Sequence, residues 1–135
     1  MARVKTIRPN VSVAEALRRL RAERIGSLVV SENGTHLVGI LSDRDILNAI
    51  ADHGIDVLGE SVRGVMTEKV FTCSRDDRVS ALMALMTNRR IRHVPVVDED
   101  GQLCGMISIG DVVKQRLDDI QSEADALREY VTKAM

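Results

Sequence analysis

Apolar residues recur at helical spacing near the start of the chain and again about half-way along it. The first set lies on one face of a predicted helix and comprises Val13, Ala16, Leu17 and Leu20. The second set repeats that face with Val79, Leu82, Met83 and Met86. Spacings of three and four residues are typical of an amphipathic helix with one buried face. Ser12 and Glu15 form a capping-box pattern at the start of the first of these helices.

A pair of short apolar runs, rich in β-branched residues, follows each predicted helix. In the first half of the chain the runs are "SLVVS" and "LVGIL", with the turn "ENGT" between them. In the second half they are "HVPVVD" and "LCGMI", joined through "EDG". Runs of this kind around a Gly-containing turn predict β-hairpins. Extended segments at 3–7 and 69–73 precede the helices, and further helices are predicted from about residues 43 and 109.

This regularity is a duplication, because sliding the sequence along itself by 66 residues needs no gap from residue 6 to residue 47. The matched pairs include Thr6 with Thr72, Ile25 with Ile91, Val30 with Val96, Gly39 with Gly105, Ser42 with Ser108 and Asp45 with Asp111. Similarity at a fixed offset indicates that one supersecondary unit was duplicated. We therefore predict an α/β (α+β) fold of two β-α-β-β-α repeats related by a pseudo-two-fold axis. The two copies are expected to bury each other's apolar faces.

The stretch between the copies, residues 52–69, lacks the Ser, Gly or Pro enrichment of a flexible tether. We expect it to pack on the body, with a short helical turn in "SVRGVMT". The predicted division is repeat 1 with its linker over 1–59, repeat 2 over 60–117 and a C-terminal helical extension over 118–135.

A heptad pattern runs through the end of the chain. Its apolar positions are Val113, Leu117, Ile120, Ala124, Leu127 and Val131, alternately four and three residues apart. This spacing is typical of a coiled-coil seam. A helix that projects from a small domain cannot bury such a stripe alone, so it should pack on the module itself or on a second subunit. A homodimer is the first expectation.

The composition of the chain limits the cellular locations and the classes of binding partner that we expect for it. The chain has 135 residues, 44% of them hydrophobic, and a net charge of −1, which gives no global bias towards nucleic acid or an anionic membrane. The first residues lack an apolar stretch of signal-peptide length, and no apolar run approaches the roughly 20 residues that span a bilayer. We therefore expect a cytoplasmic protein that binds neither nucleic acid nor membrane.

The residue types needed for catalysis or metal binding do not occur in recognisable patterns. The three histidines have no ligand spacing, and neither GxSxG nor a phosphate-cradling GxxxxGK is present. Cys73 and Cys104 belong to no CxxC motif and are expected to be ordinary buried thiols. The sequence therefore predicts no enzyme, no catalytic residue and no metal site.

Each copy contains the pattern GxxSxxD, at residues 39–45 and 105–111. A Ser followed three positions later by an acidic residue is a common helix start, so the pattern can be a cap alone. The same geometry suits a ligand, because a hydroxyl and backbone N–H groups at a helix N-terminus favour phosphate. The aspartate in the first turn could accept both hydroxyls of a ribose. The cap and the binding site remain alternatives at this point.

The run "IRHVPVVDEDGQLCGMISIGDVV" (91–113), the repeated β-α-β-β-α order and "VMT" at 65–67 together resemble the CBS domains. These domains are named after cystathionine β-synthase and usually occur as tandem pairs, or Bateman modules, and the resemblance covers nearly the whole chain. It implies a regulatory module without a catalytic cofactor. Such a module binds adenosine-containing ligands such as AMP, ADP, ATP, NAD or S-adenosylmethionine in clefts between the repeats.

The resemblance also implies roles for individual residues. Asp45 and Asp111 would hold the ribose hydroxyls, and Ser42 and Ser108 would lie near the phosphate. Thr6 and Thr72 would line the entrance. The adenine would lie between the backbone around Ile25 to Leu28 and around Ile91 to Val94, against Val30 and Val96.

The two copies differ where phosphate chemistry is expected. Arg92 and His93 stand before the second PVV run, where the first copy has Gly26 and Ser27, and Arg44 corresponds to Gly110. Arg44, Arg92 and His93 are therefore candidate phosphate contacts, although a solvated strand entry would also explain the last two. The predicted function is a nucleotide sensor that signals to a separate effector protein. A ligand-independent dimeric scaffold is the alternative, and a nucleic-acid-binding protein is disfavoured because there is no basic stripe.

Overall fold

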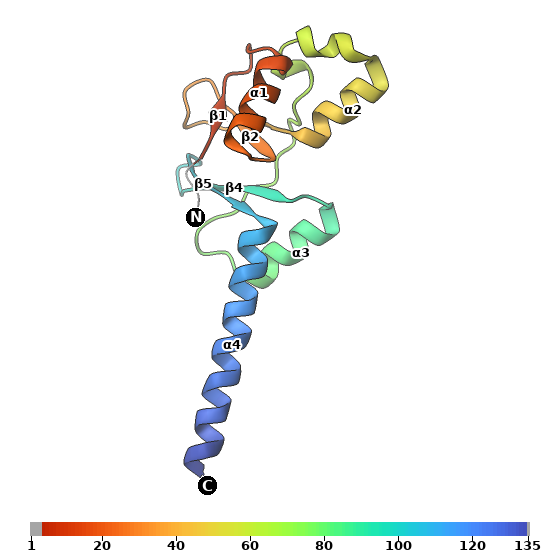
Figure 1. Ribbon diagram of the computed structural model, residues 1–135. Helices are drawn as coiled ribbons and strands as arrows, with labels where there is room; N and C mark the ends of the chain where they lie inside the picture. The colour runs from red at the N-terminus through yellow and green to blue at the C-terminus, as the bar shows by residue number, and fades with distance from the viewer. Residues whose placement is uncertain (1–3, 135) are drawn as a thin grey trace.

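The computed structural model describes residues 4–134 as two small sheets, with helices on their outer sides and one long helix that leaves the body (Figure 1). The first repeat contains β1 (Thr6–Ile7), α1 (Val13–Glu23), β2 (Ser27–Val30), β3 (Gly39–Ser42) and α2 (Asp43–His53). The linker forms two 3-10 turns, η1 (Ile55–Gly59) and η2 (Val62–Gly64). The second repeat contains α3 (Val79–Arg89), β4 (His93–Val97), β5 (Leu103–Ser108) and α4 (Ile109–Ala134). The predicted α+β fold is confirmed; Arg3, part of the predicted first strand, lies outside the described residues.

The two sheets show the duplication in their register. In the first sheet β2 lies between β1, which is parallel to it, and β3, which is antiparallel and places Ser42 opposite Ser27. In the second sheet β4 and β5 are antiparallel and place Ser108 opposite His93. The offset of 66 residues therefore holds in space at the start of each hairpin.

The predicted extended segment at 69–73 forms only a single bridge. The Cys73 N–H donates to the Pro95 carbonyl at 3.0 Å, and the Val97 N–H donates to the Cys73 carbonyl at 2.9 Å. The Cys73 side chain is buried there, and burial is the main cause that raises the pKa of its thiol to about 11. This thiol stays protonated at neutral pH, and the prediction of a buried thiol is confirmed for Cys73. Cys104, for which the same was predicted, is only half-buried.

The linker packs on the body, as predicted, and does so on the first repeat, to which it adds a strand-like contact. Thr67 pairs with Ile40 of β3, with the Ile40 N–H donating to Thr67 at 3.0 Å and the Thr67 N–H donating back at 2.8 Å. Val62 is fully buried in the core of the first repeat. The linker therefore has a fixed course past the edge of β3.

The apolar residues divide into two clusters, so the expectation that the copies bury each other's apolar faces is wrong. One cluster joins α1, α2, the first sheet and the linker around Leu28, Leu41 and Ile46. The other joins α3, the second sheet and the start of α4 around Met86 and Val94. Each repeat covers its sheet with its own helices, and the junction between the repeats is lined by polar and charged side chains together with a few apolar ones.

The helix caps follow the sequence signals with one difference. The Ser12 hydroxyl accepts the Glu15 N–H at 3.1 Å, as the capping box predicts. The Glu15 carboxylate instead accepts from the Arg18 guanidinium at 2.8 Å, so only half of the box forms. At the other end, Arg24 and its counterpart Arg90 both adopt the left-handed conformation with φ of 54°, which ends α1 and α3 in the same way.

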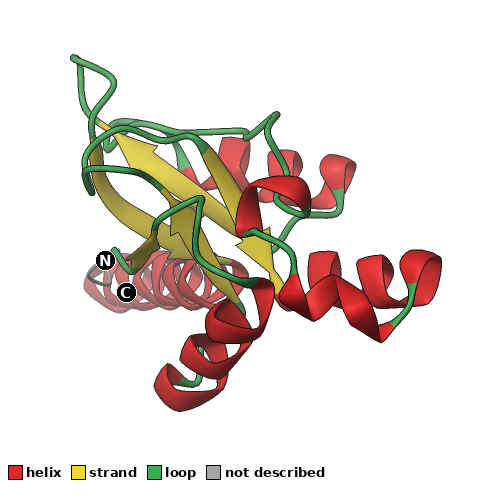
Figure 2. Ribbon diagram, turned by 90° about the horizontal axis from the view of Figure 1, so that it is seen from above, coloured by secondary structure: helices red, strands yellow, loops and turns green. Residues whose placement is uncertain are grey.

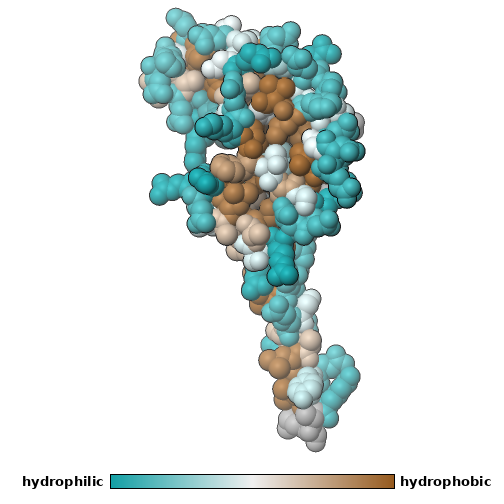
Figure 3. Space-filling view, turned by 180° about the vertical axis from the view of Figure 1, so that it is seen from behind, coloured by the Kyte–Doolittle hydropathy of each residue, from teal (hydrophilic) through white to brown (hydrophobic). Residues whose placement is uncertain are grey.

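Helix α4 extends beyond the body, and Figure 2 shows it almost end on. Val112 is buried in the second core, but no residue from Val113 to Lys133 is buried. Beyond Val112, its large exposed apolar residues are Val113, Leu117, Ile120, Leu127, Tyr130 and Val131. Seen from behind, apolar surface gathers on the body and again towards the free end of this helix (Figure 3). The predicted heptad stripe is therefore exposed in the single chain.

Candidate ligand-binding site

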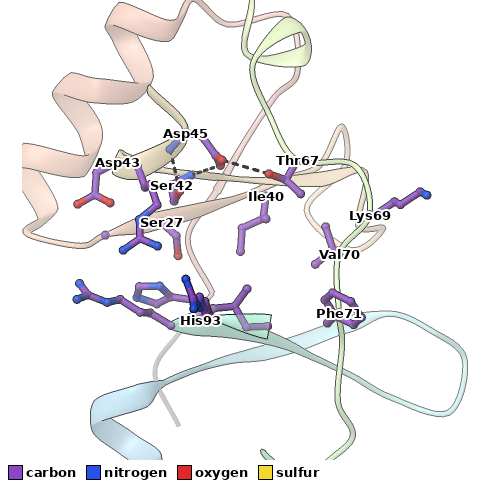
Figure 4. A pocket seen from close by; sticks show the side chains of 15 residues that line it. Ser27, Ile40, Ser42, Asp43, Asp45, Thr67, Lys69, Val70, Phe71 and His93 are labelled. Atoms are coloured by element: carbon purple, nitrogen blue, oxygen red, sulfur yellow. Dashed lines mark hydrogen bonds between the residues drawn. The ribbon is translucent and has the colours of Figure 1, made fainter. Parts of the chain in front are cut away.

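A cavity of about 290 Å³ lies where the two repeats and the linker meet. Its lining comes from the start of β2 and of α2, from the linker after Thr67, and from residues 90–93 before and at the start of β4. Figure 4 shows the first repeat above this space and the start of β4 below it. A molecule bound here would contact three segments that are far apart in the sequence.

The first GxxSxxD motif forms a complete capping box at the roof of the cavity. The Ser42 hydroxyl accepts the Asp45 N–H at 3.1 Å, and Asp45 Oδ2 accepts the Ser42 N–H at 2.9 Å. A carboxylate has about four lone-pair positions. One of them accepts the Ser42 N–H and another accepts the Thr67 hydroxyl, so two remain. The two interpretations of the motif are therefore compatible, because Asp45 can cap α2 and still accept hydroxyl groups from a ligand.

Thr67 is a cavity residue that the sequence analysis missed. Its hydroxyl donates to Asp45 Oδ1 at 3.2 Å, so the linker and the motif meet at one carboxylate (Figure 4). The stretch "VMT" at 65–67 includes this residue, but the sequence analysis used the stretch only as part of the family resemblance. The pairing of Thr67 with Ile40 brings it to the site, and such a long-range contact has no local sequence signal.

One wall of the cavity is apolar. Ile40 contributes from β3, and Val70 and Phe71 contribute from the linker (Figure 4). The Phe71 ring also carries the Arg89 guanidinium at 4.9 Å from its centre, a cation–π contact that helps to hold the ring in place. This wall can accept a flat apolar ligand group such as a purine.

Cationic side chains line the cavity as well. They come from both repeats and from the linker, and are Arg44, Lys69, Arg90 and Arg92. None of them forms an ion pair with a carboxylate of residues 4–134. Lys69 points away from the centre of the cavity in Figure 4. The remaining three arginines provide donors that a phosphate could satisfy.

His93 lies on the floor of the cavity and is half-buried (Figure 4). Burial lowers the pKa of its imidazole, Asp43 opposes this shift, and the nearby Arg92 adds to it. The ring is therefore neutral at pH 7, with one nitrogen able to donate and the other to accept. A Cβ on Gly26 would lie 3.2 Å from His93 Cε1, so the ring packs closely on the first repeat.

The CBS-domain sequence profile matches this chain over residues 1–52 and again over 62–118. This chain belongs to the CBS-domain family. The crystal structure of a CBS-domain protein, ATU1752 from Agrobacterium tumefaciens, has a TM-score of 0.80 and 44% identity, covering 84% of this chain and 90% of that one.

Two similar CBS structures contain adenosine compounds. CBSX2 in complex with AMP has a TM-score of 0.73 and 28% identity, over 85% of this chain and 88% of that one. The CBS pair of protein MJ0100 in complex with 5′-methylthioadenosine and S-adenosylmethionine has a TM-score of 0.77 and 26% identity, over 88% and 92% of the two chains. Adenosine compounds are therefore ligands of CBS pairs with this fold.

Curated relatives of the CBS pair are longer than this chain. It spans 69%, 60% and 54% of three of them, at 34%, 36% and 27% identity. Among residues 4–134, no helix is both long and apolar enough to cross a membrane. The same residues contain no cluster of three or more His, Cys, Asp or Glu that could hold a metal ion. The cytoplasmic location stays a prediction.

Six of the residues that the sequence analysis proposed as ligand contacts line the CBS cavity. They are Ser42, Arg44, Asp45, Ile91, Arg92 and His93. Arg92 therefore faces the cleft of Asp45, a point that the sequence left open. The cavity also contains Gly26 and Ser27, which belong to the backbone segment 25–28 that the resemblance placed beside the adenine. The lining residues that the sequence analysis did not propose are Ile40, Asp43, Thr67, Lys69, Val70, Phe71 and Arg90.

The remaining nominated residues lie elsewhere in the CBS pair. Leu28, Val30, Val94 and Val96 are fully buried in the two cores, and Ile25 packs against the first of them. Thr6 lies on the outer strand β1, where its carbonyl accepts from the Arg19 guanidinium at 2.7 Å, and Thr72 is exposed before the Cys73 bridge. None of these side chains lines the cavity.

Ser108 and Asp111 repeat the capping box at the start of α4. Asp111 Oδ2 accepts the Ser108 N–H and hydroxyl, both at 3.0 Å. The bond from the Ser108 backbone is the main cause that lowers the pKa of Asp111. The two residues do not line the cavity of Asp45, so a role in a second cleft remains a prediction.

Proposed function

We propose that this CBS pair is a non-enzymatic regulatory module that binds an adenine nucleotide in the cavity between its repeats. The observation that supports this proposal most strongly is the hydrogen bond of 3.2 Å between the Thr67 hydroxyl and Asp45, which lies between an apolar wall and a cationic end of one cavity. These three chemistries match the base, the ribose and the phosphate of a nucleotide. The AMP and S-adenosylmethionine complexes of similar CBS pairs support the same class of ligand.

The side chains follow one another along the cavity in an order that fits a nucleotide (Figure 4). Val70 and Phe71 lie on the linker side and would contact the adenine. Asp45 and Thr67 lie at the roof and would bind the ribose hydroxyls. Arg92 and His93, with Arg44, would bind the phosphate, and Ser42 supports Asp45 through the cap. The equivalent Ser108 and Asp111 would serve a second, weaker cleft.

Binding at this place can change the geometry of the module, because the lining comes from both repeats and from the linker. A nucleotide that contacts Asp45 above and Arg92 below would favour one relative position of the repeats. A ligand shifts a conformational equilibrium only through such differences in contact. The module would transmit this change to a separate effector protein.

A thermal-shift experiment on the purified protein tests the proposal. AMP, ADP, ATP, NAD and S-adenosylmethionine are compared at millimolar concentration, with GMP as the control for adenine recognition. A ligand at about 100 times its dissociation constant should add roughly 2.7 kcal/mol to the free energy of unfolding, a shift of several degrees. If no adenine compound raises the melting temperature, the sensor function is wrong and the ligand-independent scaffold is favoured.

The stripe on α4 supports a homodimer as part of this function. Leu117 and Leu127 are 61% and 63% exposed, far more than expected for the apolar seam of a stable helix. The helix leaves the body, so its own domain cannot cover the stripe (Figure 1). A second copy, offering the same stripe, would bury both helices in a coiled coil.

Deletion of residues 118–135 is therefore expected to weaken self-association, because it removes most of the stripe. The measurement is light scattering over a range of concentrations, with 14.9 kDa as the mass of one chain. In the full chain, Leu117→Gln with Leu127→Gln should have the same effect. The control is Asp118→Gln with Glu129→Gln, which changes the same helix away from the stripe. A wild-type protein that stays at the mass of one chain at high concentration would contradict the prediction.

A further inference from the structure

Ser27 has a buried hydroxyl that the protein itself leaves without a hydrogen bond. The residue is only 6% exposed, and its Oγ is the one buried side-chain nitrogen or oxygen in residues 4–134 that has no hydrogen-bond partner. Buried polar groups are nearly always paired, because removing them from water without a partner is costly. An exception of this kind requires an explanation.

The position of Ser27 explains why its hydroxyl has no partner within the protein. It begins β2, lines the nucleotide cavity and points into the space above His93 (Figure 4). Its Cα partner in the sheet is Ser42, the cap of α2, so it also lies beside the N-terminus of an 11-residue helix. The hydroxyl therefore lines the cavity without a partner in the protein, and is available to a bound molecule.

The charges around Ser27 indicate which ligand group this is. Arg44 belongs to the same end of α2, Arg92 and His93 face it from the second repeat, and the helix N-terminus adds a partial positive charge. Two acidic groups lie in the same turn of α2: Asp43, whose side chain is exposed, and Asp45, whose carboxylate accepts from the Ser42 N–H and the Thr67 hydroxyl. The apolar wall with Val70 and Phe71 lies on the other side of the cavity (Figure 4). A phosphoryl oxygen, which accepts hydrogen bonds, fits this end better than the base.

We infer that Ser27 is a ligand-contacting residue whose hydroxyl donates to the phosphoryl group of the bound nucleotide. The inference rests on the proposed function and adds a residue that the GxxSxxD motif does not contain. It also gives a role to the difference between the copies, because Ser27 corresponds to His93 under the offset of 66 residues. The two equivalent positions would hold one phosphate from opposite sides.

The substitution Ser27→Ala separates this role from a structural one. In the absence of ligand, the variant should melt at the wild-type temperature or above it, because it removes an unpaired polar group and breaks no bond. Its dissociation constant for AMP should rise about tenfold, the usual effect of losing a hydrogen bond to a charged group. Adenosine, which has no phosphate, should bind within about twofold of wild type, as a difference below about 0.5 kcal/mol implies.

Ser31→Ala is the matched control. Ser31 is also buried, at 2% exposure, but its hydroxyl accepts the Gly34 N–H at 3.0 Å and donates to Asn33 at 3.3 Å. This variant should lose thermal stability and keep its affinity for AMP. Melting curves and calorimetric titrations with AMP and adenosine give both readouts for the three proteins.

The outcomes are distinct. Unchanged AMP affinity in Ser27→Ala, or an equal loss for AMP and adenosine, would overturn the role of Ser27 alone, since the wild type still binds. A loss of stability like that of Ser31→Ala would assign the hydroxyl to the fold. A wild-type protein that binds neither compound would overturn the proposed function and the role of Ser27 together.

Discussion

Asp45→Ala is expected to weaken AMP binding by about one to two orders of magnitude, because each lost hydrogen bond to a charged group costs about 1.5–3 kcal/mol. The carboxylate is the group that both the cap of α2 and Thr67 share. Calorimetric titration with AMP measures the change. Adenosine should lose affinity to the same degree, since the ribose is common to both ligands.

The variant also loses part of the helix cap, which costs about 1 kcal/mol of stability. Titrations must therefore be done well below its melting temperature. Asp52→Ala is the control, because Asp52 is an exposed residue of the same helix and does not line the cavity. If Asp45→Ala binds AMP as tightly as Asp52→Ala does, the GxxSxxD motif of the first repeat is a cap only.

Gly39→Ala should destabilise the fold and the site together. A Cβ at this position would lie 2.7 Å from Met66 Sδ and 2.9 Å from the Thr67 carbonyl oxygen. The Met66 side chain can move, but the Thr67 carbonyl is fixed by its bond to the Ile40 N–H. Relief of the clash therefore requires the linker to separate from β3, which displaces the Thr67 hydroxyl from Asp45.

Overpacking of this kind costs about 1–3 kcal/mol, and urea denaturation with a two-state fit measures it. The affinity for AMP should fall as well, because the linker carries one wall of the cavity. Gly59→Ala is the matched control, since a Cβ there would meet no heavy atom within 4 Å. Equal unfolding midpoints for the two variants would show that β3 and the linker tolerate separation.

Local signals in the sequence predicted most of the secondary structure. Helix α2 begins at Asp43 and α4 at Ile109, where the caps and apolar spacing placed them, because caps and periodicity act within a few residues. The duplication then gave the order of elements, and Asp45 was nominated from its motif alone. The first strands were predicted too long, since only Thr6–Ile7 and the bridge at Cys73 form. A strand needs a partner along its length, and propensity does not supply one.

The sequence by itself determined the two repeats, the heptad pattern of the last helix and the chemistry of the GxxSxxD caps, since each depends on a pattern that can be read along the chain. The tertiary structure alone decided the composition of the cavity. The pairing of Ile40 with Thr67 brings the linker beside Asp45, and the junction of the repeats places Arg92 in the lining of the same cavity. The tertiary structure also leaves the Ser27 hydroxyl buried without a hydrogen-bond partner in the protein. Contacts between residues this far apart in the chain depend on the free energy of the whole fold, so no short stretch of sequence specifies them.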